Sequence, residues 1–328
     1  MSISGPDLYK LFADLPGPSA TDAFVAIKTP AHPSLRIGRS PRGTPVLLVR
    51  LQKGTRSFLP GTHLANLSAD YSVPCTIEVK GTGKEDGVFA IVEYTGQDVA
   101  LRNYFFMVGA SLLGALPDNP TPVSVRNVVT KFVDLFSLLA QASRNSVQGL
   151  WAELFLIASA CDPRKALDCW HRDSSERYDF SLGSDRIEAK SYSGARREHH
   201  FALEQLRHSP DLNVIICSMN VRPSGGGTSI GDLRDKIIRS LAGNSERIFH
   251  LEEQISACLG AGLPLALSQS FDAEVAHDSL GWFEAKSIPA VSRVSEFVSN
   301  VHFISDLTSA PQCALRIARH NTVFRLLL

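Results

Sequence analysis

Hydrophobic residues in the first third of the chain come in short runs that turn-forming residues separate. Between about residues 23 and 108 the runs are rich in Val, Ile, Leu and Phe, with Gly or Pro between them. They read VAIKT, LRIG, PVLLVRL, CTIEVKG, VFAIVEY and NYFFMV. Short runs of this composition, bounded by breakers, are typical of β-strands. The pattern predicts an antiparallel β-rich region, with a short amphipathic helix before it at residues 5–16.

The spacing of apolar residues changes to that of helices after the breaker-rich segment ALPDNPTP at 115–122. The segment VRNVVTKFVDLFSLLAQA predicts a helix, because its apolar residues recur every three or four positions. In VQGLWAELFLIASACD the apolar residues almost surround the helix axis, so this second helix should be buried. We therefore expect a β-rich N-terminal domain at 1–118 and a second domain at 123–328.

The second domain mixes strand and helix patterns. LNVIICSMNV is apolar enough for a strand inside a mixed sheet, and GWFEAKSIPAV and VHFISDL also read as strands. SIGDLRDKIIRSLAG and SERIFHLEEQISACLG are amphipathic helices. PSGGGTSIGD at 223–232 should be a flexible connection to a helix that is capped near Ser229. The fold class is therefore α/β in the broad sense that includes α+β.

Charge and cysteine content limit the possible functions. The chain has 328 residues and a formal net charge of zero, so any binding of nucleic acid must depend on a local basic patch. None of the six cysteines forms a CxxC pair. Cys161 and Cys169 lie near His171, but structural zinc sites use tighter, paired spacing, so buried thiols are expected there.

No targeting or membrane segment is predicted. The N-terminus lacks a basic stretch followed by an apolar run. The longest apolar stretch, YFFMVGASLLGAL, is too short to span a bilayer. We expect a cytoplasmic protein with reduced cysteines and no membrane partner.

The segment YDFSLGSDRIEAKS at 178–191 combines acids, a glycine turn and a lysine. LGSD suits a two-residue hairpin turn of type II′, with Gly183 at the first central position. Counting outward from this turn places Asp179 opposite Glu188. Because side chains alternate along a strand, Lys190 shares their face, and the apolar residues of the hairpin lie on the other.

This arrangement suits a divalent cation. Directly opposed residues have Cβ atoms about 4.5–5.5 Å apart, at which two carboxylates repel each other unless a cation lies between them. Asp179 and Glu188 would supply oxygen ligands to Mg²⁺, for which Mn²⁺ can substitute, and the Ala189 carbonyl could add another. Lys190 would hold the attacking water and stabilise a charged transition state. Glu153, the lone acid of the buried helix, would complete the ligand set, since a buried carboxylate without a partner is costly.

The same spacing also occurs in hairpins that simply face solvent, so the residues alone leave both interpretations open. The chain repeats the tripeptide at Glu284-Ala285-Lys286, with Asp278 upstream. That copy lacks the turn, the register and a buried acid before it. We expect it to be structural.

Four segments together resemble the PD-(D/E)XK nuclease superfamily: GLWAELFLIA (149–158), WHRDSSERYDF (170–180), IEAKS (187–191) and HHFALEQL (199–206). More narrowly, the chain resembles a bacterial family of uncharacterised PD-(D/E)XK motif proteins linked to restriction and phage defence. The motif acids match Asp179 and Glu188, the lysine matches Lys190, and the helical glutamate matches Glu153. Tyr178 replaces the proline that gives the motif its name.

The resemblance implies a restriction-endonuclease-like mixed sheet flanked by helices, with the active site on its second and third strands. It also implies Mg²⁺-dependent DNA cleavage in a restriction or phage-defence setting. Two other interpretations stay open: a catalytically silent module of the same fold that binds DNA or partner proteins, and an unrelated binding protein. Cleavage of both strands would favour a two-fold dimer or a partner subunit.

Basic residues follow the hairpin and are candidates for contacts with DNA. Arg196, Arg197, His199 and His200 could bind phosphate beside the metal site, because such side chains make most backbone contacts. A solvated loop, with Glu198 compensating the charge, is the equal alternative. Gln205, in the segment LEQL, could reach the substrate, or it could equally cap or line the sheet.

Overall fold

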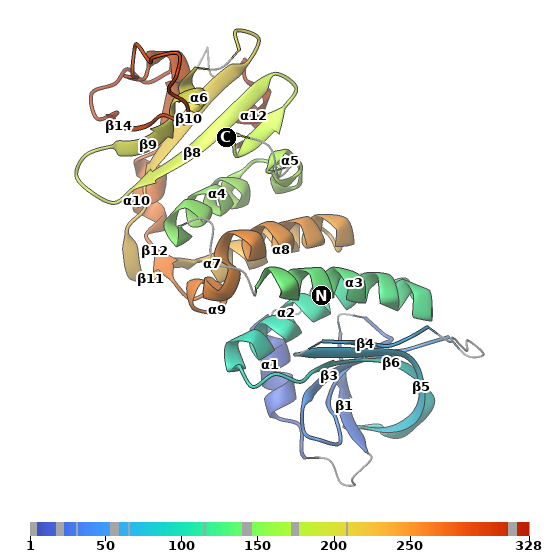
Figure 1. Cartoon of the computed structure of the whole chain (residues 1–328). Helices are drawn as coiled ribbons and strands as arrows, with labels where there is room; N and C mark the ends of the chain where they lie inside the picture. The colour runs from blue at the N-terminus through green and yellow to red at the C-terminus, as the bar shows by residue number, and fades with distance from the viewer. Residues whose placement is uncertain are drawn as a thin grey trace. The chain divides into compact units, whose positions relative to one another are not determined.

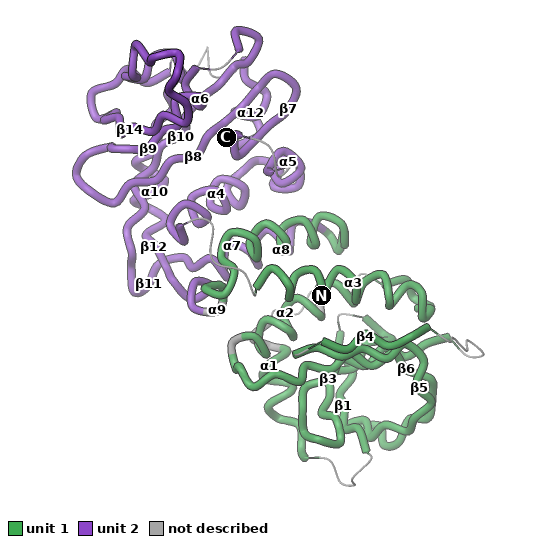
Figure 2. Tube along the Cα trace, viewed as in Figure 1, with its two compact units in different colours: residues 1–142, 242–264 green, residues 143–241, 265–328 purple. Residues whose placement is uncertain are grey.

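The computed structural model describes residues 5–17, 23–30, 32–52, 59–64, 66–114, 116–139, 146–171, 177–207, 209–313 and 320–327. The chain forms two compact units (Figure 2). Unit 1 comprises residues 1–142 and 242–264, and unit 2 comprises 143–241 and 265–328. Each unit has its own sheets and its own helices.

The six-stranded sheet of unit 1 curls back on itself (Figure 1). Its strands are β1 (Phe24–Lys28), β2 (Leu35–Arg39), β3 (Pro45–Arg50), β4 (Thr62–His63), β5 (Leu67–Val79) and β6 (Gly83–Tyr94). They lie in the order β1-β2-β3-β6-β5-β4, and β1 also pairs with β5 in parallel. This last pairing closes a ring of five strands around a core that contains Val46, Leu48 and Phe89. The β-rich N-terminal region predicted from the sequence is confirmed.

The longer helices in the described part of unit 1 are α1 (Gly5–Ala13), α2 (Val99–Gly114), α3 (Pro122–Leu138) and α8 (Ser245–Leu259). The strand expected at NYFFMV is wrong, because residues 103–108 lie inside α2. Tyr104, Phe105 and Phe106 point in different directions around the helix and are all buried, so this part of α2 is covered on every side. A short apolar run of this kind fits a buried strand or a buried helix equally well. Among the described residues, no helix is both long and apolar enough to cross a membrane.

The breaker-rich segment 115–122 joins two helices of the same unit. Thr121 caps α3 through the amide of Ser124, and α3 packs against β5 and α8. The β-rich unit therefore includes residues up to 142 and the later segment 242–264, which pack with it. Breakers mark turns as well as domain boundaries, so the functional division at 118–123 stays a prediction.

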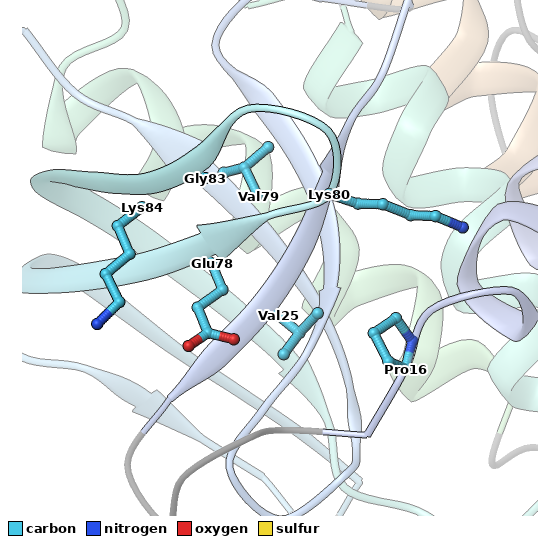
Figure 3. A pocket seen from close by; sticks show the side chains of 7 residues that line it. All are labelled: Pro16, Val25, Glu78, Val79, Lys80, Gly83 and Lys84. Carbon is cyan, nitrogen blue, oxygen red and sulfur yellow. The ribbon is translucent and has the colours of Figure 1, made fainter.

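Unit 1 has a hollow of about 290 Å³ beside the β5–β6 hairpin (Figure 3). It is lined by Pro16, Val25, Glu78, Val79, Lys80, Gly83 and Lys84. Lys80 donates a hydrogen bond to the backbone oxygen of Asp14 over 3.2 Å. This lining gathers no set of acids that could bind a metal ion.

The central sheet of unit 2 is mixed. Its strands are β7 (Phe180–Leu182), β8 (Asp185–Tyr192), β10 (Asn213–Asn220) and β13 (Gly281–Glu284), in the order β13-β10-β8-β7. β10 runs parallel to β8 and antiparallel to β13, and β7 runs antiparallel to β8. Helices lie beside this sheet (Figure 1). The expected α/β fold, with a mixed sheet and flanking helices, is confirmed.

The remaining elements of unit 2 surround this sheet. The helices are α4 (Val147–Ser159), α5 (Pro163–Cys169), α6 (Leu203–Leu206), α7 (Ile230–Ser240), α10 (Ala273–Asp278) and α12 (Thr322–Leu327). Two smaller ribbons pair β9 (Glu198–Ala202) with β14 (His302–Asp306), and β11 (Pro223–Ser229) with β12 (Ser270–Phe271). The expected loop at 223–229 is therefore a strand. Gly227 permits it, because a Cβ atom there would lie 2.1 Å from the oxygen of Phe271.

Candidate active site

The hairpin β7–β8 has the register that the sequence predicts. Phe180 pairs with Ile187, and Leu182 pairs with Asp185. Gly183 has a φ of 57°, which a type II′ turn requires at its first central position. Both Phe180 and Ile187 are fully buried, so one face of the hairpin packs on apolar residues. The polar face is left for the acids and the lysine.

Asp179 lies immediately before β7 and is fixed by β8. Its Oδ2 accepts a hydrogen bond from the backbone N–H of Ala189 over 2.7 Å. Its backbone oxygen accepts one from the N–H of His171 over 2.9 Å. These two bonds hold the carboxylate at the end of the hairpin, next to Glu188.

Glu188 lies in the middle of β8 and is 4% exposed. Its Oε1 lies 2.7 Å from Nζ of Lys190 and accepts a hydrogen bond from Nε2 of Gln205 over 2.5 Å. Its Oε2 is buried and has no hydrogen-bond partner among the described residues. Buried polar atoms nearly always have a hydrogen-bond partner, so this oxygen is available to an ion or an ordered water.

Glu153 reaches the same place from α4. The helix packs against β8 and α7, and Glu153 is 5% exposed. Its Oε2 accepts a hydrogen bond from Nε1 of Trp170 over 2.7 Å and lies 2.9 Å from Nε2 of His171. One ligand atom from each of Glu153, His171 and Asp179 lies within 4.8 Å of the others.

Burial and mutual repulsion disfavour the charged forms of Asp179 and Glu188. Burial, then Coulomb repulsion from Glu188 and from Glu153, raises the pKa of Asp179 well above its ordinary value. Burial also raises the pKa of Glu188, although Lys190 opposes the shift. A raised carboxyl pKa means that the charged form is disfavoured here until another cation arrives.

Lys190 is the ammonium group of the site. Burial alone lowers its pKa, but attraction to Glu188 and the hydrogen bond with it outweigh burial, so the pKa is raised. Lys190 is therefore protonated at neutral pH. Three acids, Glu188, Asp179 and Glu153, act on this one ammonium group and raise its pKa. Hard oxygen donors in this number fit a divalent cation.

The chain was compared with families of known proteins. The family model described as "Putative PD-(D/E)XK family member (DUF4420)" matches residues 8–308. The chain belongs to this family. No curated protein and no solved structure matched it in the comparisons. The match covers parts of both units, and the resemblance to the PD-(D/E)XK superfamily is confirmed.

In this family member, the predicted acids and lysine lie together. Asp179, Glu188, Lys190 and Glu153 all belong to unit 2 and surround one buried spot. The backbone N–H of Ala189 faces Asp179, whereas its carbonyl as a metal ligand stays a prediction. The metal-ligand and catalytic roles of these residues likewise stay predictions.

The predicted contacts with DNA divide into two pairs. Arg197 donates to the oxygens of Ser218 and Ser279 over 3.0 and 2.8 Å, so its guanidinium group is held by the protein itself. His199 is buried and lies 2.7 Å from the hydroxyl of Ser218. Burial, the largest cause, lowers the pKa of His199 to about 4. Arg196 and His200 are exposed, so only these two can reach a ligand without a rearrangement.

The sequence did not point to one residue of the site, His171, and left the role of another, Gln205, open. His171 was weighed as a ligand only with Cys161 and Cys169; neither cysteine forms a disulfide, and Cys161 is exposed rather than buried as expected. No local pattern pointed to His171, because the β-bridge of the preceding Trp170 with Phe180 joins separate segments of the chain. Gln205 had been a candidate without a settled role, and its hydrogen bond to Glu188 places it at the site.

Proposed function

We propose that this chain is a metal-dependent deoxyribonuclease that hydrolyses phosphodiester bonds within DNA. The observation that carries the proposal is the buried set of three carboxylates around one ammonium group, with an oxygen of Glu188 that has no hydrogen-bond partner in the described part of the chain. Membership of a PD-(D/E)XK family supports it, because members of that superfamily are usually nucleases. Mg²⁺ is the proposed cofactor, and Mn²⁺ can replace it.

Each group has a proposed role. Asp179, Glu188 and Glu153 hold the ion, with the Ala189 carbonyl as a further ligand. When bound there, a divalent cation supplies a water of lowered pKa and neutralises charge on the phosphate. Lys190 holds the attacking water and donates to the phosphate oxygen on which negative charge develops.

The site can be reached from solvent. The side chains of Lys190 and Asp179 are 19% and 14% exposed, whereas those of Glu188 and Glu153 are 6% and 7% exposed. The deeper carboxylates can therefore hold an ion while the lysine meets the substrate. Arg196 and His200 are the proposed phosphate contacts outside the site.

The setting of this activity is a further part of the proposal. We place it in a restriction or phage-defence system in the cytoplasm, with DNA as the substrate. Cleavage of both strands calls for a homodimer or a partner subunit, since the described residues of each chain form one such site. Target recognition is proposed for the N-terminal β-rich domain.

The test is a cleavage assay with the full chain. Wild type, Asp179→Asn and Lys190→Ala are incubated with supercoiled plasmid, phage DNA with and without modified bases, and RNA, in Mg²⁺, Mn²⁺ or EDTA. Wild type should cut DNA only with a divalent ion, and both variants should be inactive. If folded wild type cuts no nucleic acid with either ion, the enzyme proposal fails. DNA binding without cleavage would instead identify a catalytically silent module.

A further inference from the structure

His171 is an imidazole placed among the acids of the site. Its Nε2 lies 2.9 Å from Oε2 of Glu153 and 3.7 Å from Oδ1 of Asp179. The ring is therefore between the acid of α4 and the acid of the hairpin. Its side chain is 20% exposed, so this position is open to an entering ion.

The backbone holds His171 in an uncommon conformation. Its φ is 39°, a value that residues other than glycine rarely adopt. The N–H of His171 donates to the oxygen of Asp179, and the preceding Trp170 pairs with Phe180. Such backbone strain persists where the surrounding structure enforces it, and it concentrates at functional sites. The imidazole is thus positioned by the same hairpin that positions the acids.

A separate observation points to a ligand at this place. Glu188 is 4% exposed, and its Oε2 has no hydrogen-bond partner among the described residues. Glu188 lies near enough to Asp179 to raise its pKa, so it adjoins the cluster, although its oxygens are not among the three ligand atoms within 4.8 Å of one another. A cation that met the imidazole nitrogen and the carboxylates together would satisfy Oε2 of Glu188.

We propose that His171 is a metal ligand, and that the site therefore binds Mn²⁺ more tightly than Mg²⁺. Imidazole nitrogen suits transition-metal ions, whereas Mg²⁺ prefers carboxylate, carbonyl and water oxygen. The donor set is then one nitrogen from His171 with oxygens from Glu153, Asp179 and Glu188. This inference rests on the proposed metal site of the nuclease and adds to it the identity of the preferred ion.

The competing interpretation is that His171 only forms an ion pair with Glu153. The two are separated by pulsed electron paramagnetic resonance of Mn²⁺ bound to the full chain without nucleic acid. A bound imidazole gives nitrogen modulation, which changes when the protein is labelled with ¹⁵N-histidine. Wild type should show this modulation, and His171→Gln should lose it. The matched control is His277→Gln, since His277 is an exposed histidine on α10 of the same unit.

Affinities give the second measurement. Calorimetry should find Mn²⁺ bound about 10-fold or more tighter than Mg²⁺ by wild type, with this preference lost in His171→Gln. His171→Asp replaces the nitrogen by an oxygen and should shift the preference toward Mg²⁺. His171→Asp is also the alternative test variant if His171→Gln does not fold.

The outcomes separate this inference from the proposed function. If Mn²⁺ binds and Glu188→Gln abolishes binding, but wild type shows no nitrogen modulation, His171 is not a ligand while the nuclease site stands. If wild type binds neither ion, the metal site and the proposed function both fail. Nitrogen modulation that persists in folded His171→Gln would also overturn the assignment.

Discussion

The tripeptide Glu-Ala-Lys occurs twice in this protein, at 188–190 and at 284–286, and the two copies meet different surroundings. In the first, the side chains of Glu188 and Lys190 are 6% and 19% exposed, and their atoms are 2.7 Å apart. In the second, Lys286 is 80% exposed although it lies 2.5 Å from Glu284. Both pairs have close contacts, so the ion pair itself does not distinguish them.

The two copies differ in the groups that surround the pair. The first continues β8 inside the sheet, where Asp179 and Glu153 add negative charge in a buried place. The second leaves β13 and enters a short 3-10 helix, where the lysine points to solvent. An exposed pair is screened by water and contributes little, whereas buried excess charge requires compensation. The location of a motif in the fold, rather than its letters, therefore decides whether it can bind an ion.

The largest expected difference between the copies is in catalysis. Lys190→Ala should lower the rate of DNA cleavage by about 100-fold or more, because it removes a donor to the charged transition state. Lys286→Ala should leave the rate unchanged, since its ammonium group faces solvent. Initial rates with Mg²⁺ or Mn²⁺ measure both effects. Equal losses in the two variants would contradict the distinction.

Stabilisation by a divalent ion should also differ. At about 10 to 100 times its dissociation constant, an ion that binds only the folded state adds about 1.4–2.7 kcal/mol of stability. For a unit of the size of unit 2, we expect a rise of about 3–10 °C in the melting temperature. Glu188→Gln should remove this rise and Glu284→Gln should keep it, as differential scanning calorimetry can show. A rise that survives in Glu188→Gln would place the ion elsewhere.

The smallest expected effect concerns the free energy of unfolding without metal. The pKa of Asp179 is raised in the folded protein, so the folded state binds more protons than the unfolded state between the ordinary and the raised value. Stability from this group is therefore lost as pH rises through that window. Asp179→Asn should remove the loss and stabilise the metal-free protein at pH 7 by about 0.5–2 kcal/mol.

Asp278 is the matched control, because it precedes the second tripeptide and its side chain is 82% exposed. Asp278→Asn should change the free energy of unfolding by less than about 0.5 kcal/mol. Urea titrations at pH 5 and pH 7 with EDTA provide the comparison. If Asp179→Asn destabilises the protein at pH 7, repulsion among the acids does not lower the stability of the metal-free protein.

Local rules were enough to predict the hairpin and its polar face. The turn at Gly183 fixes the register, and alternation then places Glu188 and Lys190 together. Glu153 could be found because a lone acid in an apolar helix needs a reason to be there. The same rules failed for α2, where a short apolar run fits both kinds of element.

The amino-acid sequence by itself determined the elements around the site and the face of β8 that carries its charged groups, because turn chemistry and side-chain alternation act over a few residues. Only the tertiary structure brought His171 and Gln205 to these acids and turned Arg197 and His199 inward. It also assigned α3 and α8 to the β-rich unit. Such placements depend on packing between segments far apart in the chain, and the free energy of that packing cannot be inferred from a local sequence pattern.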